Sequence, residues 1–102
     1  MAGIRPWTSD DRTGGPLDEI FRSVQSRFPD AVVSRLVGTH PADDDNVFWV
    51  RRAGVEAQID TAPGGAPPFT VESDAPGTRL DTADAEAARE HIEHLLIDAA
   101  ER

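Results

Sequence analysis

Turn-forming residues divide the centre of the chain, residues 31–78, into runs that are too short for helices. Four of these runs are rich in β-branched and aromatic residues, and Gly, Pro, Asp or Asn bounds each of them. Such runs are typical of β-strands, because branched side chains pack well on a pleated surface. The pattern predicts strands over residues 31–37, 47–52, 55–61 and 69–73.

Apolar residues recur at helical spacing on both sides of this centre. The first stripe follows Pro16, a residue suited to the first helical position, and ends before Pro29. A longer C-terminal helix is expected to begin at a cap at Asp81 or Thr82 and to run to about Ala100. The stripes consist of Leu17, Ile20, Phe21, Val24 and Phe28, and of Ala85, Ala88, Ile92, Leu95, Leu96 and Ala99.

The order of one helix, four strands and one helix predicts an α+β fold. Strands that follow one another through short loops favour an antiparallel meander. Two amphipathic helices most simply share one face of such a sheet. Residues 16–102 are therefore expected to form a single domain. Residues 1–15 are polar and glycine-rich and are predicted to be a flexible arm, from which Trp7 docks at the edge of the core.

The second and third predicted strands determine which residues share a face of the sheet. If Ala53-Gly54 is a two-residue turn, Phe48 lies opposite Ile59 on the core side. Side chains alternate along a strand, so Trp49 must point to the side without helices. The candidate interaction surface on that outer side consists of Val47, Trp49, Arg51, Glu56 and Gln58.

Acidic residues outnumber basic ones, and the formal net charge is −9. Nucleic-acid binding needs basic side chains that neutralise phosphates, so DNA, RNA and anionic membranes are not expected as partners. A basic protein is a better candidate, because opposite charges steer the encounter. No segment reaches the roughly 20 apolar residues that span a bilayer. Cysteine is absent, which favours a cytoplasmic setting. Arginine supplies all 10 basic residues, which favours a GC-rich bacterial genome over the alternative of a salt-adapted organism.

Two clusters match metal sites only in part. His91 and His94 lie at i, i+3 on the C-terminal helix, whereas the metalloprotease helix needs an i, i+4 pair. The aspartates at 43–45, near His40, lack the closing glutamate of a calcium loop. No metal or cofactor is therefore expected.

The sequence also lacks a catalytic signature. No serine is framed by a nucleophile motif such as G-x-S-x-G. Gly64-Gly65 lies among prolines, which remove the amides that a phosphate cradle requires. We therefore expect that the chain is not an enzyme.

Three features together resemble small bacterial proteins of unassigned function and some toxin-immunity proteins. They are the hairpin over residues 47–61, the sequence Pro-Phe-Thr-Val-Glu at residues 68–72, which overlaps the fourth predicted strand, and a helix start that carries Thr82, Asp84 and Glu86. The resemblance implies no role for any single residue.

These observations favour a non-enzymatic interaction domain that binds a protein through the helix-free side of the sheet. It would be an immunity- or antitoxin-like inhibitor of a basic enzyme, or a chaperone-like binding protein. A homodimer through the same side is an equal prediction. The alternative is a small-molecule-binding or enzymatic domain, with a pocket between sheet and helices near His91 and His94.

Overall fold

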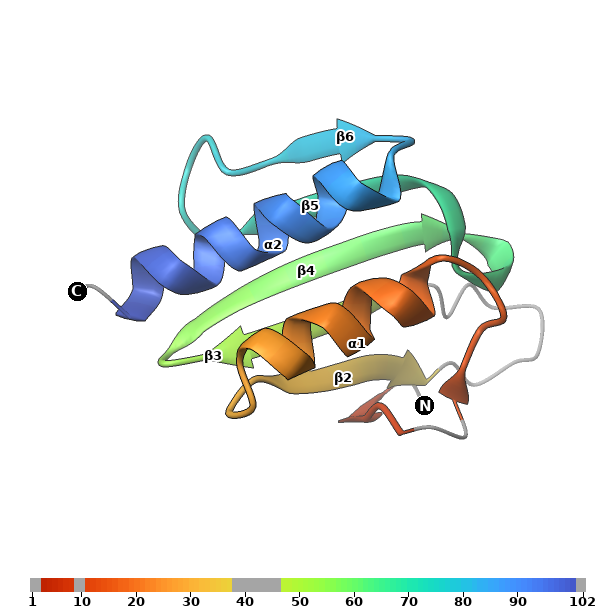
Figure 1. Cartoon of the computed structure of the whole chain (residues 1–102), viewed down its shortest axis with the longest axis horizontal. Helices are drawn as coiled ribbons and strands as arrows, with labels where there is room; N and C mark the ends of the chain where they lie inside the picture. Colours follow the sequence, from red (N-terminus) through yellow and green to blue (C-terminus); the bar gives the residue numbers. More distant parts are fainter. Residues whose placement is uncertain (1–2, 9–10, 38–46, 101–102) are drawn as a thin grey trace.

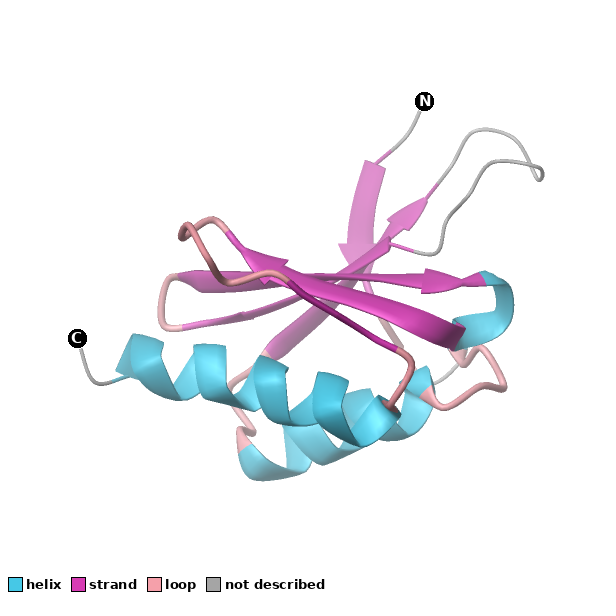
Figure 2. Cartoon of the chain, turned by 90° about the horizontal axis from the view of Figure 1, so that it is seen from above, coloured by secondary structure: helices cyan, strands magenta, loops and turns pink. Residues whose placement is uncertain are grey.

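The computed structural model describes residues 3–8, 11–37 and 47–100 of the chain. In this part of the chain, six strands form one antiparallel sheet in the order β1-β2-β3-β4-β5-β6, and both helices lie on the same side of it (Figures 1 and 2). The elements are β1 (Gly3–Pro6), α1 (Leu17–Arg27), β2 (Val32–Val37), β3 (Val47–Arg52), β4 (Val55–Ala62), the short 3-10 turn η2 (Pro63–Gly65), β5 (Ala66–Ser73), β6 (Leu80–Thr82) and α2 (Ala85–Ala100). The predicted α+β class and the antiparallel meander are confirmed.

Two strands were missing from the prediction, which had four. Strand β1 lies in the segment that was assigned to a flexible arm, and it pairs with β2 along its whole length. Its only large apolar side chain, Ile4, is 63% exposed, so no buried pattern marked it in the sequence. Backbone pairing continues past β1, since the Trp7 amide donates to the Val33 carbonyl at 2.9 Å.

Strand β6 replaces the predicted start of the second helix. Leu80 pairs with Val71 of β5, and Asp81 pairs with Thr70. The helix cap is Asp84 rather than Asp81 or Thr82, because its Oδ1 accepts the Glu86 amide at 3.0 Å. Asp and Thr are common cap residues, and a strand of three residues gives little pattern to compete with that signal.

The β3–β4 hairpin has the predicted register. Phe48 lies opposite Ile59, and Trp49 opposite Gln58. The turn is tight because Ala53 and Gly54 both adopt positive φ, at 53° and 83°. The assignment of residues to the two faces of this hairpin is therefore confirmed.

The core lies between the sheet and the helices. Helix α1 directs its predicted stripe inward, and α2 adds Ala88, Ile92, Leu95 and Leu96. The sheet contributes Val33, Phe48, Val50, Ala57, Ile59, Phe69 and Val71. Phe21 is fully buried and meets Trp7 and Phe48 edge-on, each at 5.4 Å between ring centroids. Trp7 docks on the core as expected.

The segment after β1 is held by a buried carboxylate. Asp11 accepts hydrogen bonds from the Thr8 amide and hydroxyl, at 2.9 and 3.1 Å. Its other oxygen pairs with Arg35 of β2 at 3.1 Å. These bonds hold the chain against the sheet where Trp7 covers Phe21.

A close approach of two glycines fixes the start of α1. A Cβ placed on Gly15 would lie 2.3 Å from the Gly64 carbonyl oxygen, and one on Gly65 would lie 2.1 Å from the Thr13 hydroxyl. Only glycine allows the loop before α1 to contact the connection between β4 and β5 so closely.

Candidate functional site

The side of the sheet opposite α1 and α2, here called the open face, has no helix over it in the described part of the chain (Figure 2). Trp49 lies near its middle, in a row with Ser34 of β2, Gln58 of β4 and Glu72 of β5. The indole is half-buried, although Phe48 and Val50 on either side of it are buried in the core. A large aromatic residue therefore lies between strands on a surface that the helices leave uncovered.

The β1–β3 side of the open face is largely apolar. Ile4 of β1 pairs with Leu36 of β2, and Val32 pairs with Arg51 of β3. Val32 is 50% exposed, and Leu36 and Val47 are half-buried. Together with Trp49 these side chains give the open face an exposed apolar border.

The β4–β6 side of the open face is acidic. Its carboxylates, here called the acidic strip, belong to Glu56, Asp60, Glu72, Asp74 and Asp81. These carboxylates outnumber the guanidiniums that the open face carries, at Arg51 and Arg79. The open face thus combines an apolar border with a negatively charged half.

Arg79 shows the electrostatic character of the acidic strip. Its Nε lies 3.2 Å from Asp81, which also accepts a 2.6 Å hydrogen bond from the Thr70 hydroxyl. The Thr70 and Arg79 hydrogen bonds lower the pKa of Asp81 below its ordinary value. Asp81 raises the pKa of Arg79, with further contributions from the charges of Glu72 and Asp60. This side of the sheet therefore stabilises a guanidinium.

A hollow of about 240 Å³ opens beside Trp49. It is lined by Trp49, Glu56, Gln58, Glu72, Ser73 and Asp74. The Gln58 amide nitrogen donates to Asp60 at 3.0 Å. Among the described residues no cation pairs with Glu72 or Asp74, and the Arg51–Glu56 pair is long, at 3.9 Å. The hollow therefore presents an indole and acceptor oxygens.

The structure places all five residues of the candidate surface on the open face. Trp49 lies opposite Gln58 and Arg51 opposite Glu56, as the hairpin register requires, and Val47 lies opposite Asp60. The carboxylates of Glu72 and Asp74 were not predicted as part of it. Strand β5 alternates outward Thr70 and Glu72 with buried Phe69 and Val71, and this alternation was visible in the sequence. The register of β5 against β4 was not visible, because the seven-residue loop expected between those strands does not determine which residues lie opposite one another.

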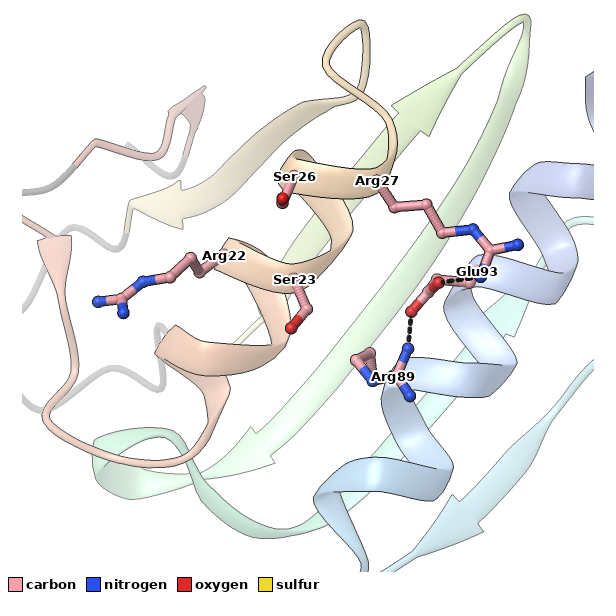
Figure 3. Close-up of a pocket in the computed structure, with 6 residues that line it drawn as sticks. All are labelled: Arg22, Ser23, Ser26, Arg27, Arg89 and Glu93. Atoms are coloured by element: carbon pink, nitrogen blue, oxygen red, sulfur yellow. Dashed lines mark hydrogen bonds and ion pairs between the residues drawn. The ribbon is translucent and has the colours of Figure 1, made fainter.

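A second hollow, of about 440 Å³, lies between α1 and α2 on the outer side of the helix layer (Figure 3). The Glu93 side chain is only 5% exposed there and accepts from Arg27 at 2.9 Å. Its other oxygen pairs with Arg89, which also pairs with Glu86. These charges satisfy one another, so the cluster joins α1 to α2. Sequence reasoning missed it because Glu93 lies beside the apolar stripe of α2.

The two helical histidines do not come together as a site. A ring nitrogen of His91 bonds to the Thr78 carbonyl and ties α2 to the turn between β5 and β6. His94 is exposed and borders the groove between the helices. The other histidine, His40, and the aspartates at 43–45 lie outside the described residues.

Comparisons of the chain with protein-family models, with curated proteins and with solved structures gave no significant match. In the described part of the chain, neither helix has the length and apolar character needed to cross a membrane.

Proposed function

We propose that the chain is a non-enzymatic interaction domain that binds a basic protein through its open face. The observation that carries the proposal is Trp49, which lies half-buried on the uncovered side of the sheet beside the acidic strip. Tryptophan is enriched among the residues that supply most of the binding energy at protein interfaces. The apolar border supplies further area that a partner would remove from water.

Charge favours a basic partner over a second copy of the chain. Each copy has a net charge of −9, and pairing two open faces brings two acidic strips into one interface. Like charges in such an interface oppose association, whereas a basic surface gains from the same field. Self-association remains a distinct outcome of the experiment below.

The most concrete form of this role is an immunity- or antitoxin-like inhibitor that covers the basic surface of an enzyme. A chaperone-like role, in which the open face holds a basic segment, uses the same residues. The chain has no cysteine, and arginine supplies all of its basic residues other than histidine. This composition supports a bacterial cytoplasmic setting for either role. A small-molecule or enzymatic role has less support, because Ile92, Leu95 and Leu96 of α2 are buried where its pocket was expected.

Capture with matched variants tests the proposal. Wild-type chain, Trp49→Ala and Arg22→Ala, a control on the exposed side of α1, are immobilised and exposed to a lysate of source cells. Each captured protein is then purified and its binding is measured by calorimetry. We expect a basic protein that binds wild type and Arg22→Ala alike, and binds Trp49→Ala at least tenfold more weakly.

Three results would overturn the proposal. The first is a purified partner that binds all three chains equally. The second is a partner that is acidic. The third is a dimer, seen by light scattering of the wild type and lost in Trp49→Ala, which would assign the open face to a second copy.

A further inference from the structure

The hollow beside Trp49 has the dimensions of a site for one side chain. Its volume is about 240 Å³, below the roughly 300–1,000 Å³ of typical small-molecule pockets. Trp49, Gln58 and Glu72 lie in one row across β3, β4 and β5, and Ser73 lies opposite Ala57 in the next row. The hollow is therefore built on paired strands, which hold its lining in place.

The lining determines which kind of side chain it suits. The carboxylates of Glu56, Glu72 and Asp74 only accept hydrogen bonds when ionised, and among the residues that the structure describes no cationic side chain lines the hollow. A fitting occupant must therefore donate several hydrogen bonds and carry positive charge. It must also tolerate contact with the indole of Trp49.

Arginine meets these requirements better than lysine. Its planar guanidinium has five donors in a fixed fork that matches carboxylates, and it stacks on aromatic rings. The chain already places Arg52 over the Phe28 ring, with its guanidinium carbon 4.5 Å from the centroid. It also holds the Arg79 guanidinium in the acidic strip, against Asp81. Guanidinium groups thus already occupy comparable surroundings in this molecule.

We propose that the hollow beside Trp49 receives an arginine side chain of the basic partner, with the guanidinium against the indole and hydrogen bonded to Glu72. This inference rests on the proposed function, because it names the chemistry by which the open face recognises its partner. Arginine then anchors the partner, and the apolar border contacts the surface around that anchor.

Two peptides of equal charge test the inference. One octapeptide alternates glycine and arginine, the other alternates glycine and lysine, and both have blocked ends. Their affinities are measured by calorimetry at low salt, and the indole N–H resonances of Trp49 and Trp7 report where they bind. We expect the arginine peptide to bind at least fivefold more tightly, and to shift the Trp49 resonance but not that of Trp7.

Matched variants show whether the preference comes from the hollow. Glu72→Gln should lower the affinity for the arginine peptide at least fivefold. Glu19→Gln makes the same charge change on the exposed side of α1 and should leave that affinity unchanged. Trp49→Phe keeps a ring and should reduce the preference for arginine without abolishing binding. Circular dichroism verifies that each variant is folded.

The outcomes separate this inference from the proposed function. If both peptides bind with equal affinity and Glu72→Gln lowers both affinities alike, the arginine inference is overturned. The open face would then bind basic partners by charge alone. The inference would also be overturned if neither peptide binds, or if peptide binding shifts resonances of the helices and not that of Trp49. In either case the capture experiment would still decide the proposed function.

Discussion

Trp49 lies directly opposite Gln58 across the β3–β4 hairpin, on the side of the sheet that neither helix covers. Its neighbour Phe48 points into the core and is buried. We therefore expect Phe48→Ala to lower the free energy of unfolding by about 3–5 kcal/mol, because it loses buried area and leaves a cavity. Trp49→Ala should lower it by less than about 1 kcal/mol. Urea denaturation measures both, and equal losses would contradict the assignment of faces.

Trp7 should stabilise the fold, although it lies in a segment with the composition of a flexible arm. Its ring packs edge-on against fully buried Phe21. Trp7→Ala should lower the free energy of unfolding by about 2 kcal/mol, because it removes both buried apolar area and an aromatic pair. Ile4→Ala on exposed β1 is the control and should cost no more than about 0.5 kcal/mol. A thermal midpoint that does not change in Trp7→Ala would show that the segment does not hold to the core in solution.

Glu93 should contribute more to stability than the neighbouring Glu90. The carboxylate of Glu93 accepts from both Arg27 and Arg89, whereas Glu90 is exposed and lies 3.9 Å from Arg89. Glu93→Gln should lower the free energy of unfolding by about 1.5–3 kcal/mol, the range for hydrogen bonds to charged groups. Glu90→Gln should change it by less than about 0.5 kcal/mol. Matching denaturation midpoints for the two variants would contradict this assignment.

Asp81 should make stability depend on pH in a defined direction. Hydrogen bonds from Thr70 and Arg79 hold its folded pKa below the ordinary value of 3.8. The folded chain therefore binds this proton more weakly than the unfolded chain does. The resulting stabilisation is complete above that ordinary value and is lost as pH falls through the folded pKa.

Thermal melts of wild type and Asp81→Asn test this dependence. The wild type should melt higher at about pH 7, and the difference should shrink as pH falls below the ordinary pKa of 3.8 and through the lowered pKa of the folded chain. A difference that stays constant over this range would mean that Asp81 acts through its shape and not through its charge.

The sequence was sufficient to predict the elements that contain many buried residues. The stripe from Leu17 to Phe28 predicted α1, and the Ala53-Gly54 turn predicted the β3–β4 register, because in both cases residues close in sequence determine the geometry. Strands β1 and β6 are short edge strands, held by backbone pairing that any side chain permits. Strand β1 pairs with a strand that is distant in the sequence. At β6, the residues Asp81 and Thr82 also match a helix cap, and that signal pointed to a helix instead. The local pattern therefore could not reveal either strand.

The candidate surface was predicted only as far as the hairpin extends. Trp49 and Gln58 follow from the turn, but the carboxylates that complete the hollow come from β5. Their arrival beside Trp49 depends on the connection between β4 and β5, where Gly15 contacts Gly64 and Gly65. The Glu93 cluster depends likewise on how α1 meets α2, and neither helix determines this by itself.

The bond between Arg27 and Glu93 joins residues that are 66 positions apart, whereas each strand pairs with the next strand along the chain. Closing a long loop costs more entropy than closing a short one, so we expect the Arg27–Glu93 contact to form late in folding. An interaction made after the transition state changes the unfolding rate and leaves the folding rate nearly constant. In stopped-flow kinetics, Glu93→Gln should therefore move only the unfolding arm, so this ion pair governs how long the native state persists and not how quickly it is reached.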